Sequence, residues 1–296
     1  MERKKPVPIT RRQAIQSLTT LTAGALIKPT SILAVDAVKS KTRFAVLGDW
    51  GTGDDDEIGL ARQMVAHHHQ TALDFVLTAG DNIYPNGSGR HFQKKFEQPF
   101  AGLLKDQVNF YAVLGNHDVE DGRRDQLQYP LFNMGGRNYY LLSRGNGLVD
   151  FFMLDSTALD RTQITWLENS LRSSRAKWKI AVFHHPIYSS GKKHGSEMRQ
   201  RAQIEPLFTH YHVNVVFSGH DHIYERTFPQ NGVQYFVTGA GGKTRRGGVD
   251  LRSPCRAASY DEDNHFMLIE VDEEEIGFRA ISETGAVIDS GTIKQE

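Results

Sequence analysis

Cysteine is almost absent from this sequence, with Cys255 as the single example among 296 residues. An intramolecular disulfide is therefore excluded, and so is a metal site built from several thiolates. Net charge is absent as well, because 35 Lys and Arg balance 35 Asp and Glu, so no nucleic-acid-binding face is expected. We expect Cys255 to be inert, and we expect stability to come from the hydrophobic core and any bound metal.

Long apolar runs are also missing. The weakly apolar stretch 14–27 is too short for a permanent membrane anchor, and it follows Arg11-Arg12 and precedes Pro29. This order resembles a bacterial twin-arginine export signal, although Ala14 stands where such signals usually carry a larger apolar residue. We therefore expect residues 1–37 to be an export signal and the protein to be a periplasmic or extracellular monomer. The alternative is an amphipathic helix that stays in the mature protein.

What the chain does have, from Thr42 onward, is a regular series of short apolar runs separated by polar loops and amphipathic stretches. Runs of four or five apolar residues bounded by turn residues are typical of buried strands, and longer periodic stretches are typical of helices. Strands are predicted at 44–47, 75–77, 110–114, 151–154, 180–183, 213–217, 235–237, 266–269, 277–281 and 287–293, and helices at 58–65, 92–100, 162–171 and 198–210. One domain, residues 38–296, with two packed sheets and outer helices is expected.

Polar clusters follow five of the predicted strands, where α/β folds place their functional sites. These clusters are Gly48-Asp49-Trp50-Gly51, Gly80-Asp81-Asn82, Gly115-Asn116-His117-Asp118, His184-His185-Pro186 and Gly219-His220-Asp221-His222. Any one of them could be an ordinary turn, but five in chain order indicate a common site.

The residue types in these clusters indicate a metal site. Carboxylate, amide and imidazole donors without thiolate suit iron, manganese or zinc. Their number exceeds what one four-coordinate ion needs and favours two metal ions, an arrangement that serves in-line displacement at a phosphate ester.

These motifs resemble those of the purple acid phosphatases, in the metallophosphoesterase (calcineurin-like) superfamily, and most closely the small, single-domain, tartrate-resistant type. The similarity extends over residues 42–248 and includes the stretches VFHHPIYSSG and VVFSGHDHIYERT. The fold that it implies is α/β (α+β), a four-layer α-β-β-α sandwich of two mixed β-sheets flanked by helices.

The resemblance also implies a dinuclear centre. The first ion would be Fe(III), held by Asp49, Tyr84, His222 and the bridging Asp81. The second would be a divalent ion (Fe, Zn or Mn), held by Asp81, Asn116, His184 and His220. His117 would contact the phosphate and the leaving group, and so would His194, for which a merely solvated loop position is the alternative.

Gly51 and Tyr84 distinguish this chain within the superfamily. Most metallophosphoesterases carry a histidine at the position of Gly51, and this chain instead carries Tyr84 in the second motif. A phenolate is a hard anionic donor that prefers ferric iron, so the lost imidazole and the gained phenolate together predict Fe(III).

The function implied is hydrolysis of small phosphomonoesters by in-line attack of a metal-bound hydroxide, with inorganic phosphate as product. Two alternatives stay open: a phosphodiesterase or nucleotide hydrolase on the same metals, and a non-catalytic metal- or phosphate-binding relative.

Several conspicuous stretches outside the motifs receive simpler interpretations. His67-His68-His69 is interpreted as a solvated helix end and Asp54-Asp55-Asp56-Glu57 as a helix cap. The glycine-rich stretch 239–248 lacks the context of a nucleotide P-loop and is interpreted as a flexible rim loop, with Lys243, Arg245 and Arg246 available for substrate selection. The three tryptophans, Trp50, Trp166 and Trp178, are interpreted as packing residues.

Overall fold

Two β-sheets dominate the computed structural model, which describes residues 41–295. The first sheet has six strands in the order β13-β12-β11-β1-β2-β3, and the second has seven in the order β10-β8-β9-β7-β6-β5-β4. The strands are β1 Thr42–Leu47, β2 Phe75–Thr78, β3 Asn109–Ala112, β4 Tyr140–Arg144, β5 Val149–Met153, β6 Trp178–Val182, β7 Val215–Ser218, β8 Tyr224–Thr227, β9 Gln234–Thr238, β10 Arg256–Tyr260, β11 His265–Val271, β12 Glu275–Ser282 and β13 Val287–Lys294. The predicted export signal lies outside the described residues.

Both sheets are mixed. In the first, β1, β2 and β3 run parallel, and the C-terminal strands β11, β12 and β13 form an antiparallel meander that joins β1. In the second, β5, β6, β7 and β9 run parallel, while β4, β8 and β10 are antiparallel to their neighbours. Parallel strands place their carboxyl ends at one edge, so the loops after β1, β2, β3, β6 and β7 are the ones that can build a shared site.

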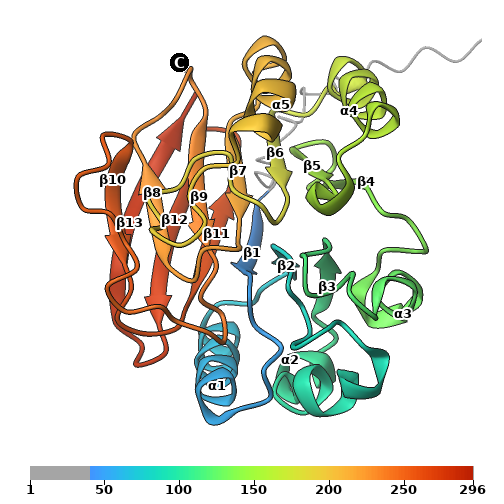
Figure 1. Ribbon diagram of the computed structural model, residues 1–296, viewed down its shortest axis with the longest axis vertical. Helices are drawn as coiled ribbons and strands as arrows, with labels where there is room; N and C mark the ends of the chain where they lie inside the picture. Colours follow the sequence, from blue (N-terminus) through green and yellow to red (C-terminus); the bar gives the residue numbers. More distant parts are fainter. Residues whose placement is uncertain (1–40, 296) are drawn as a thin grey trace, which may run out of the picture. The chain divides into compact units, whose positions relative to one another are not determined.

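Helices cover the outer face of each sheet, as Figure 1 shows, with α1 and α2 on one side and α4 and α5 on the other. The helices are α1 Asp55–Gln70, α2 Ala101–Lys105, α3 Arg123–Gln128, α4 Arg161–Ser173 and α5 Met198–His210. The predicted helix 92–100 is instead a π-helical segment, Gln93–Glu97, which a turn at 98–100 separates from α2. The predicted four-layer α-β-β-α sandwich of two mixed sheets is confirmed.

The central strands of the second sheet have continuous apolar sequences because both of their faces are buried. Phe151 of β5 packs into the core between the sheets, whereas its neighbour Phe152 packs against the cluster that includes α4 and α5. Alternate residues of β6, β7 and β9 divide between the same two clusters, because a strand covered on both faces has no polar side.

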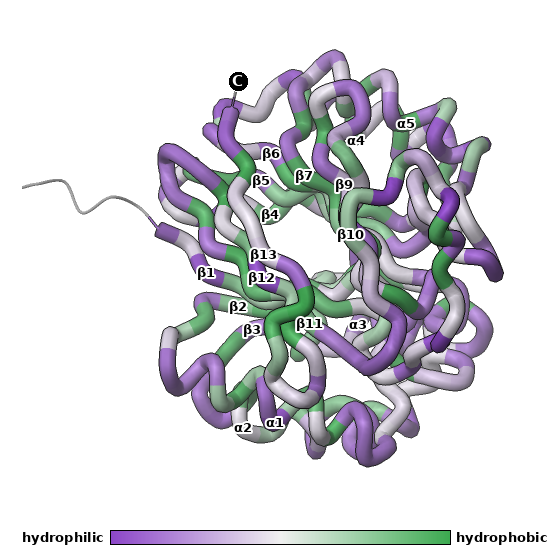
Figure 2. Tube along the Cα trace, turned by 90° about the vertical axis from the view of Figure 1, so that its left-hand side faces the viewer, coloured by the Kyte–Doolittle hydropathy of each residue, from purple (hydrophilic) through white to green (hydrophobic). Residues whose placement is uncertain are grey.

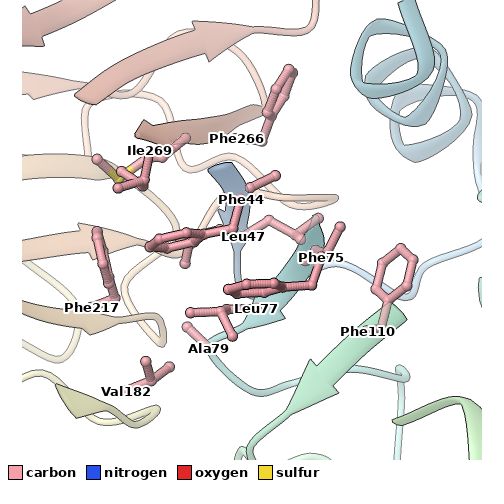
Figure 3. Packing of buried hydrophobic residues seen from close by; sticks show 14 of the residues in the cluster. Phe44, Leu47, Phe75, Leu77, Ala79, Phe110, Val182, Phe217, Phe266 and Ile269 are labelled. Carbon is pink, nitrogen blue, oxygen red and sulfur yellow. The ribbon is translucent and has the colours of Figure 1, made fainter. Parts of the chain in front are cut away.

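The core between the sheets is rich in aromatic rings. Phe44 of β1 stacks on Phe75 of β2 with centroids 5.1 Å apart, and Phe151 of β5 meets Phe44 edge-on at 5.1 Å. Figure 3 shows Val182 and Phe217 of the second sheet pointing into the same cluster. Hydrophobic segments follow the strands and hydrophilic ones the outer loops (Figure 2). No helix within residues 41–295 combines the length and apolar character that crossing a membrane requires.

The tryptophans pack as predicted. Trp50 and Trp178 are fully buried, and Trp166 lies 4.9 Å from the ring of Tyr139. Cys255 is half-buried and its thiol is free.

Candidate metal centre

The loops that follow the parallel strands carry all of the predicted ligands. In the first sheet these loops supply oxygen donors, from Asp49 after β1, Asp81 and Tyr84 after β2, and Asn116 after β3. In the second sheet they supply imidazoles, from His184 after β6 and from His220 and His222 after β7. The two donor types therefore come from different sheets and meet at one edge of the sandwich.

Three of these residues have a left-handed backbone. Asp49, Asp81 and His220 have φ angles of 55°, 48° and 69°, a conformation that non-glycine residues rarely adopt. Hydrogen bonds between the turns hold them there: the backbone N–H of His220 donates to Asp49 Oδ2 at 2.8 Å, and that of His117 donates to Asp81 Oδ1 at 2.9 Å. Such strained turns are typical of functional sites, where neighbouring structure fixes a side-chain direction.

One group of donor atoms converges on the phenol of Tyr84. Its Oη lies 3.2 Å from Asp49 Oδ1, 3.1 Å from Asp81 Oδ2 and 3.3 Å from His222 Nε2. His222 Nε2 is in turn 3.4 Å from Asp49 Oδ1. These four residues are those that the resemblance assigns to the ferric ion.

A second group converges on His184. Its Nε2 lies 3.1 Å from Asn116 Oδ1, 3.2 Å from His220 Nδ1 and 3.5 Å from Asp81 Oδ2. His184 Nδ1 is 2.9 Å from the carbonyl oxygen of Ala79, so Nδ1 carries the hydrogen and Nε2 keeps its lone pair. Asp81 Oδ2 belongs to both groups, which is the position that a bridging ligand requires.

The charges around these atoms call for a cation. Asp49 and Asp81 are 0% and 1% exposed, and within residues 41–295 no Lys or Arg lies at ion-pair distance from either carboxylate. Burial raises the pKa of Asp49 and of Asp81. The pKa of Tyr84 is raised as well, first by burial and then by the negative charges of Asp49 and Asp81. A bound cation would therefore neutralise these oxygens, in addition to the nearby ammonium group of Lys243.

The imidazoles are in the state that metals require. Burial lowers the pKa of His184 and His220, so both rings are neutral and can donate a lone pair. Asp49, Asp81 and His184 present ligand atoms within 4.8 Å of one another. The donor set fits a dinuclear centre, and the assignment of each ligand stays a prediction.

The two predicted catalytic histidines line a pocket of about 750 Å³ beside the ligand groups. His117 Nδ1 lies 2.6 Å from the carbonyl oxygen of Pro85, which leaves Nε2 as the nitrogen free for a substrate. His194 is exposed at the rim, and its ring centroid is 4.0 Å from that of His220. The structure therefore brings both residues to the site, and their roles stay predictions.

Gly51 gives a physical reason for the pairing of a lost histidine with a gained tyrosine. A Cβ atom on Gly51 would lie 1.8 Å from the carbonyl oxygen of Asn82 and 2.7 Å from Cα of Ile83. The chain that leads to Tyr84 therefore occupies the space that any side chain at position 51 would need. The Tyr84 N–H also donates to the Gly51 carbonyl at 2.9 Å, which fixes the tyrosine loop across the glycine.

Asp118 is a supporting residue that the sequence interpretation did not identify. This fully buried carboxylate accepts hydrogen bonds from the backbone of Asn82 and Ile83 at 2.8 and 3.1 Å and from Gly115 N at 2.8 Å. The side chain of Gln126 adds a bond of 2.5 Å. Asp118 therefore joins the loop that carries Asp81 and Tyr84 to the loop that carries Asn116. Its place in a polar cluster was visible in the sequence, but these partners were not.

His185 and Asp221 also lie at the site without having been assigned a role. His185 presents a ring nitrogen to the same neighbourhood as His184 and His220, and its Nδ1 is 2.9 Å from Ser156 Oγ. Asp221 is 2% exposed and accepts from the backbone of the loop that carries His194.

Two of the simpler interpretations need correction in detail. Asp54 caps α1 as predicted, accepting from Glu57 N at 3.1 Å, but Glu57 itself is buried and bonds to Thr52 and Gly53. The three histidines do end α1, yet His68 accepts from Leu73 N at 3.1 Å and is not simply solvated. The stretch 239–248 does contribute Lys243, Arg245 and Arg246 to the pocket rim.

Comparison with known proteins agrees with this geometry. The family model of the calcineurin-like phosphoesterases matches residues 42–224. The chain is 32% identical over 238 residues to Purple acid phosphatase 17 of Arabidopsis thaliana, covering 70% of each chain. It is 28% identical over 243 residues to human Tartrate-resistant acid phosphatase type 5, covering 70% of this chain and 74% of that one.

Two solved structures share the fold. GAP50, the anchor in the inner membrane complex of Plasmodium, superposes with a TM-score of 0.78 at 22% identity, covering 87% of this chain and 90% of that one. The purple acid phosphatase PPD1 from yellow lupin seeds gives 0.73 at 20% identity, covering 87% and 54%. At these identities the likeness shows the architecture alone.

Proposed function

The chain belongs to the calcineurin-like phosphoesterase family, and from that premise we propose that it is an acid phosphatase that hydrolyses phosphate monoesters. Its relatives support a metal-dependent phosphoesterase with a dinuclear centre. We propose Fe(III) and a divalent ion, Fe, Zn or Mn, as the metals. The observation that carries this proposal is Tyr84, whose phenol lies within 3.3 Å of Asp49, Asp81 and His222, beside a Gly51 that leaves no room for a histidine.

Each ligand group has a distinct part in this proposal. Asp49, Tyr84 and His222, with Asp81, would hold the ferric ion, and Asn116, His184 and His220, with Asp81, would hold the divalent one. Two bound cations supply the charge neutralisation that in-line displacement at phosphorus needs, and they lower the proton affinity of the attacking water.

The protein's own groups then act on the ester. His117, whose Nδ1 is held by the carbonyl of Pro85, presents Nε2 to the phosphate and passes its proton to the departing alkoxide. The proton moves from Nε2 to the ester oxygen as the P–O bond breaks. His194 at the rim would provide a second contact to the phosphate.

The first experiment compares 4-nitrophenyl phosphate with bis(4-nitrophenyl) phosphate, using the purified protein with its metals determined. We expect faster turnover of the monoester and two metal ions per chain. Faster turnover of the diester would replace the proposal with a phosphodiesterase. Two bound metals without turnover of either would instead identify a non-catalytic binding protein.

Asp81→Ala tests the shared ligand. Because Asp81 Oδ2 belongs to both donor groups, we expect metal content and turnover to be lost together. Asp106→Ala, which removes a more exposed carboxylate that pairs with His69, is the matched control and should keep both. Near-normal activity in Asp81→Ala would exclude the two-metal mechanism.

Export by the twin-arginine route, cleavage near residue 37 and a monomeric state are further proposals. The basis of the first two is the pattern of Arg11-Arg12 and the apolar stretch 14–27, both outside the described residues. Fractionation of cells that produce the full chain, compared with an Arg11→Lys, Arg12→Lys double variant, tests the route. Export of the double variant at the wild-type level would exclude it.

A further inference from the structure

Two loops at the rim of the pocket are joined into one unit. Gly191 and Val249 form an isolated antiparallel bridge, and Lys192 N donates to the carbonyl of Gly248 at 2.7 Å. Asp250 N donates to the carbonyl of Ser190, also at 2.7 Å. The loop 191–195, which follows β6, is therefore held against the loop 242–248, which follows β9.

This pair of loops is anchored to the turn that carries His220 and His222. Asp221, between these two histidines, accepts from Ser189 Oγ at 2.6 Å and from Gly195 N at 3.0 Å. On the other loop, Arg245 N donates to the carbonyl of His222 at 3.0 Å. The position of the paired loops relative to the ligand groups is thus fixed by direct bonds to the ligand-bearing turn.

Three cations on the paired loops line the pocket. They are Lys193 from the first loop and Lys243 and Arg245 from the second. The Nζ of Lys243 lies 3.6 Å from the centroid of the Tyr84 ring, which places an ammonium group directly beside the ligand groups. In the part of the chain from 41 to 295, no carboxylate is at ion-pair distance from any of the three.

The acidic residues of the pocket gather elsewhere. Arg246, the fourth cation of the rim, donates to the carbonyl of Glu262 at 2.8 Å and lies 3.7 Å from a carboxylate oxygen of Asp263. The backbone N–H of Glu283 donates to the carbonyl of Asn264. Burial raises the pKa of Glu283, and the nearby carboxylates of Asp56 and Asp263 raise it further. Arg246 therefore pairs with this acidic side, whereas within residues 41–295 Lys193, Lys243 and Arg245 form no ion pair with it. Lys243 instead lies close enough to Asp81 and Asp49 to feel their charge.

We propose that Lys193, Lys243 and Arg245 form a second anion subsite, which selects phosphomonoesters whose leaving group carries a further phosphate or carboxylate. The pocket volume of about 750 Å³ lies in the range that accommodates a whole small molecule. Lys and Arg are the side chains that bind phosphate and carboxylate oxygens most strongly. The acidic side of the pocket, formed by Glu262, Asp263 and Glu283, repels an anion, so the second anionic group must lie beside the paired loops. Because these loops are bonded to the ligand-bearing turn, substrates with a short distance between their two anionic groups fit best.

The hydrolytic part of this inference rests on the proposed phosphatase activity. Phenyl phosphate and 3-carboxyphenyl phosphate are a suitable pair, because their leaving phenols are of nearly equal acidity and only one carries a second anion. We expect kcat/KM for the carboxylated ester to exceed that for phenyl phosphate by about tenfold, and this ratio to fall with added salt. A ratio near one would overturn the proposal.

Lys193→Gln and Arg245→Gln test the named residues. Each should lower the ratio by about fivefold, the effect of one ion pair at a partly exposed site, and the double variant should lower it further. Lys105→Gln removes an exposed cation at the end of α2, away from the pocket, and should leave the ratio unchanged. A ratio that stays at the wild-type value in both single variants and in the double variant would refute the assignment.

Binding separates this inference from the proposed function. Calorimetry of the metal-loaded protein with phenylphosphonate and 3-carboxyphenylphosphonate, neither of which can be hydrolysed, measures the same preference without turnover. If no phosphate ester is hydrolysed, the proposed function fails, yet tighter binding of the carboxylated phosphonate that is lost in the double variant still supports the subsite. Equal binding of the two phosphonates overturns the subsite whatever the activity.

Discussion

Asp118→Asn should destabilise the fold by breaking the connection between two ligand-bearing loops. Asparagine has the same shape as aspartate but replaces one acceptor oxygen by an NH₂ group. Oδ2 of Asp118 accepts from Gly115 N at 2.8 Å and from Asn82 Nδ2 at 3.0 Å, and Oδ1 accepts from Ile83 N and Gln126 Nε2. Whichever way the amide is oriented, one buried backbone N–H, of Gly115 or of Ile83, loses its acceptor and faces another donor, whereas the side chains of Asn82 and Gln126 keep other acceptors.

The magnitude follows from that one donor. An unsatisfied buried donor costs about 1–3 kcal/mol, so the free energy of unfolding should fall by about 1–3 kcal/mol. For a domain of this size, each kcal/mol lowers the unfolding midpoint by about 2–4 °C, so the expected fall in Tm is about 2–12 °C.

Thermal unfolding followed by circular dichroism on metal-depleted protein measures this effect without a contribution from metal affinity. Asp55→Asn, which changes an exposed carboxylate in the first turn of α1, is the matched control and should change the free energy of unfolding by no more than about 0.5 kcal/mol. An Asp118→Asn midpoint within about 1 °C of wild type would refute the view that Asp118 joins the two loops.

Three further predictions concern single residues. Tyr84→Phe should abolish the visible phenolate-to-iron charge-transfer band expected of the metal-loaded protein, whereas Tyr129→Phe should keep it; a band of unchanged intensity in Tyr84→Phe would remove the basis for Fe(III). His117→Ala should slow esters with poor leaving groups most, because a good leaving group departs without a proton, and an equal loss across a series of phenyl phosphates would argue against the acid role. Burial raises the pKa of Glu57 from 4.5 to about 8, so the folded state holds a proton that the unfolded state has released, and stability should fall as pH rises between these two values. Glu57→Gln should remove that dependence, worth at most about 5 kcal/mol, and unfolding midpoints that show the same pH dependence in both proteins would contradict it.

Most of the strands that the sequence revealed have continuous apolar runs, although β12 and β13 were predicted despite their mixed residues. β4, β8 and β10 were not predicted because they combine polar and apolar residues, as in Tyr224-Glu-Arg-Thr of β8. β4 and β10 also lie at the edges of the second sheet. Glu225 is buried in β8 because it accepts from Ser190 N at 2.6 Å, a partner 35 residues away. Such a partner leaves no local pattern in the sequence.

The candidate ligands could be proposed because each one follows a strand by two to six residues, in motifs that resemble those of a known family. The supporting residues could not be found in this way. Asp118 and Asp221 act on backbone N–H groups of loops that lie 26 to 36 residues away in the chain, and every residue type except proline has such a group. Gly51 was noticed as a departure from the family pattern, but only the position of the Asn82 carbonyl explains why no side chain fits there.

The division of donors between the sheets has a consequence for assembly of the protein. Among the candidate ligands, neither sheet alone supplies both anionic oxygens and imidazoles, so an ion that needs both sets has high affinity only for the state in which the sheets are packed together. By mass action such an ion favours that state over all others, by about 2.7 kcal/mol when its free concentration is a hundred times its Kd. The ions would thus hold the two sheets together. A chelator should weaken the contact between the sheets as a whole before it changes any one loop.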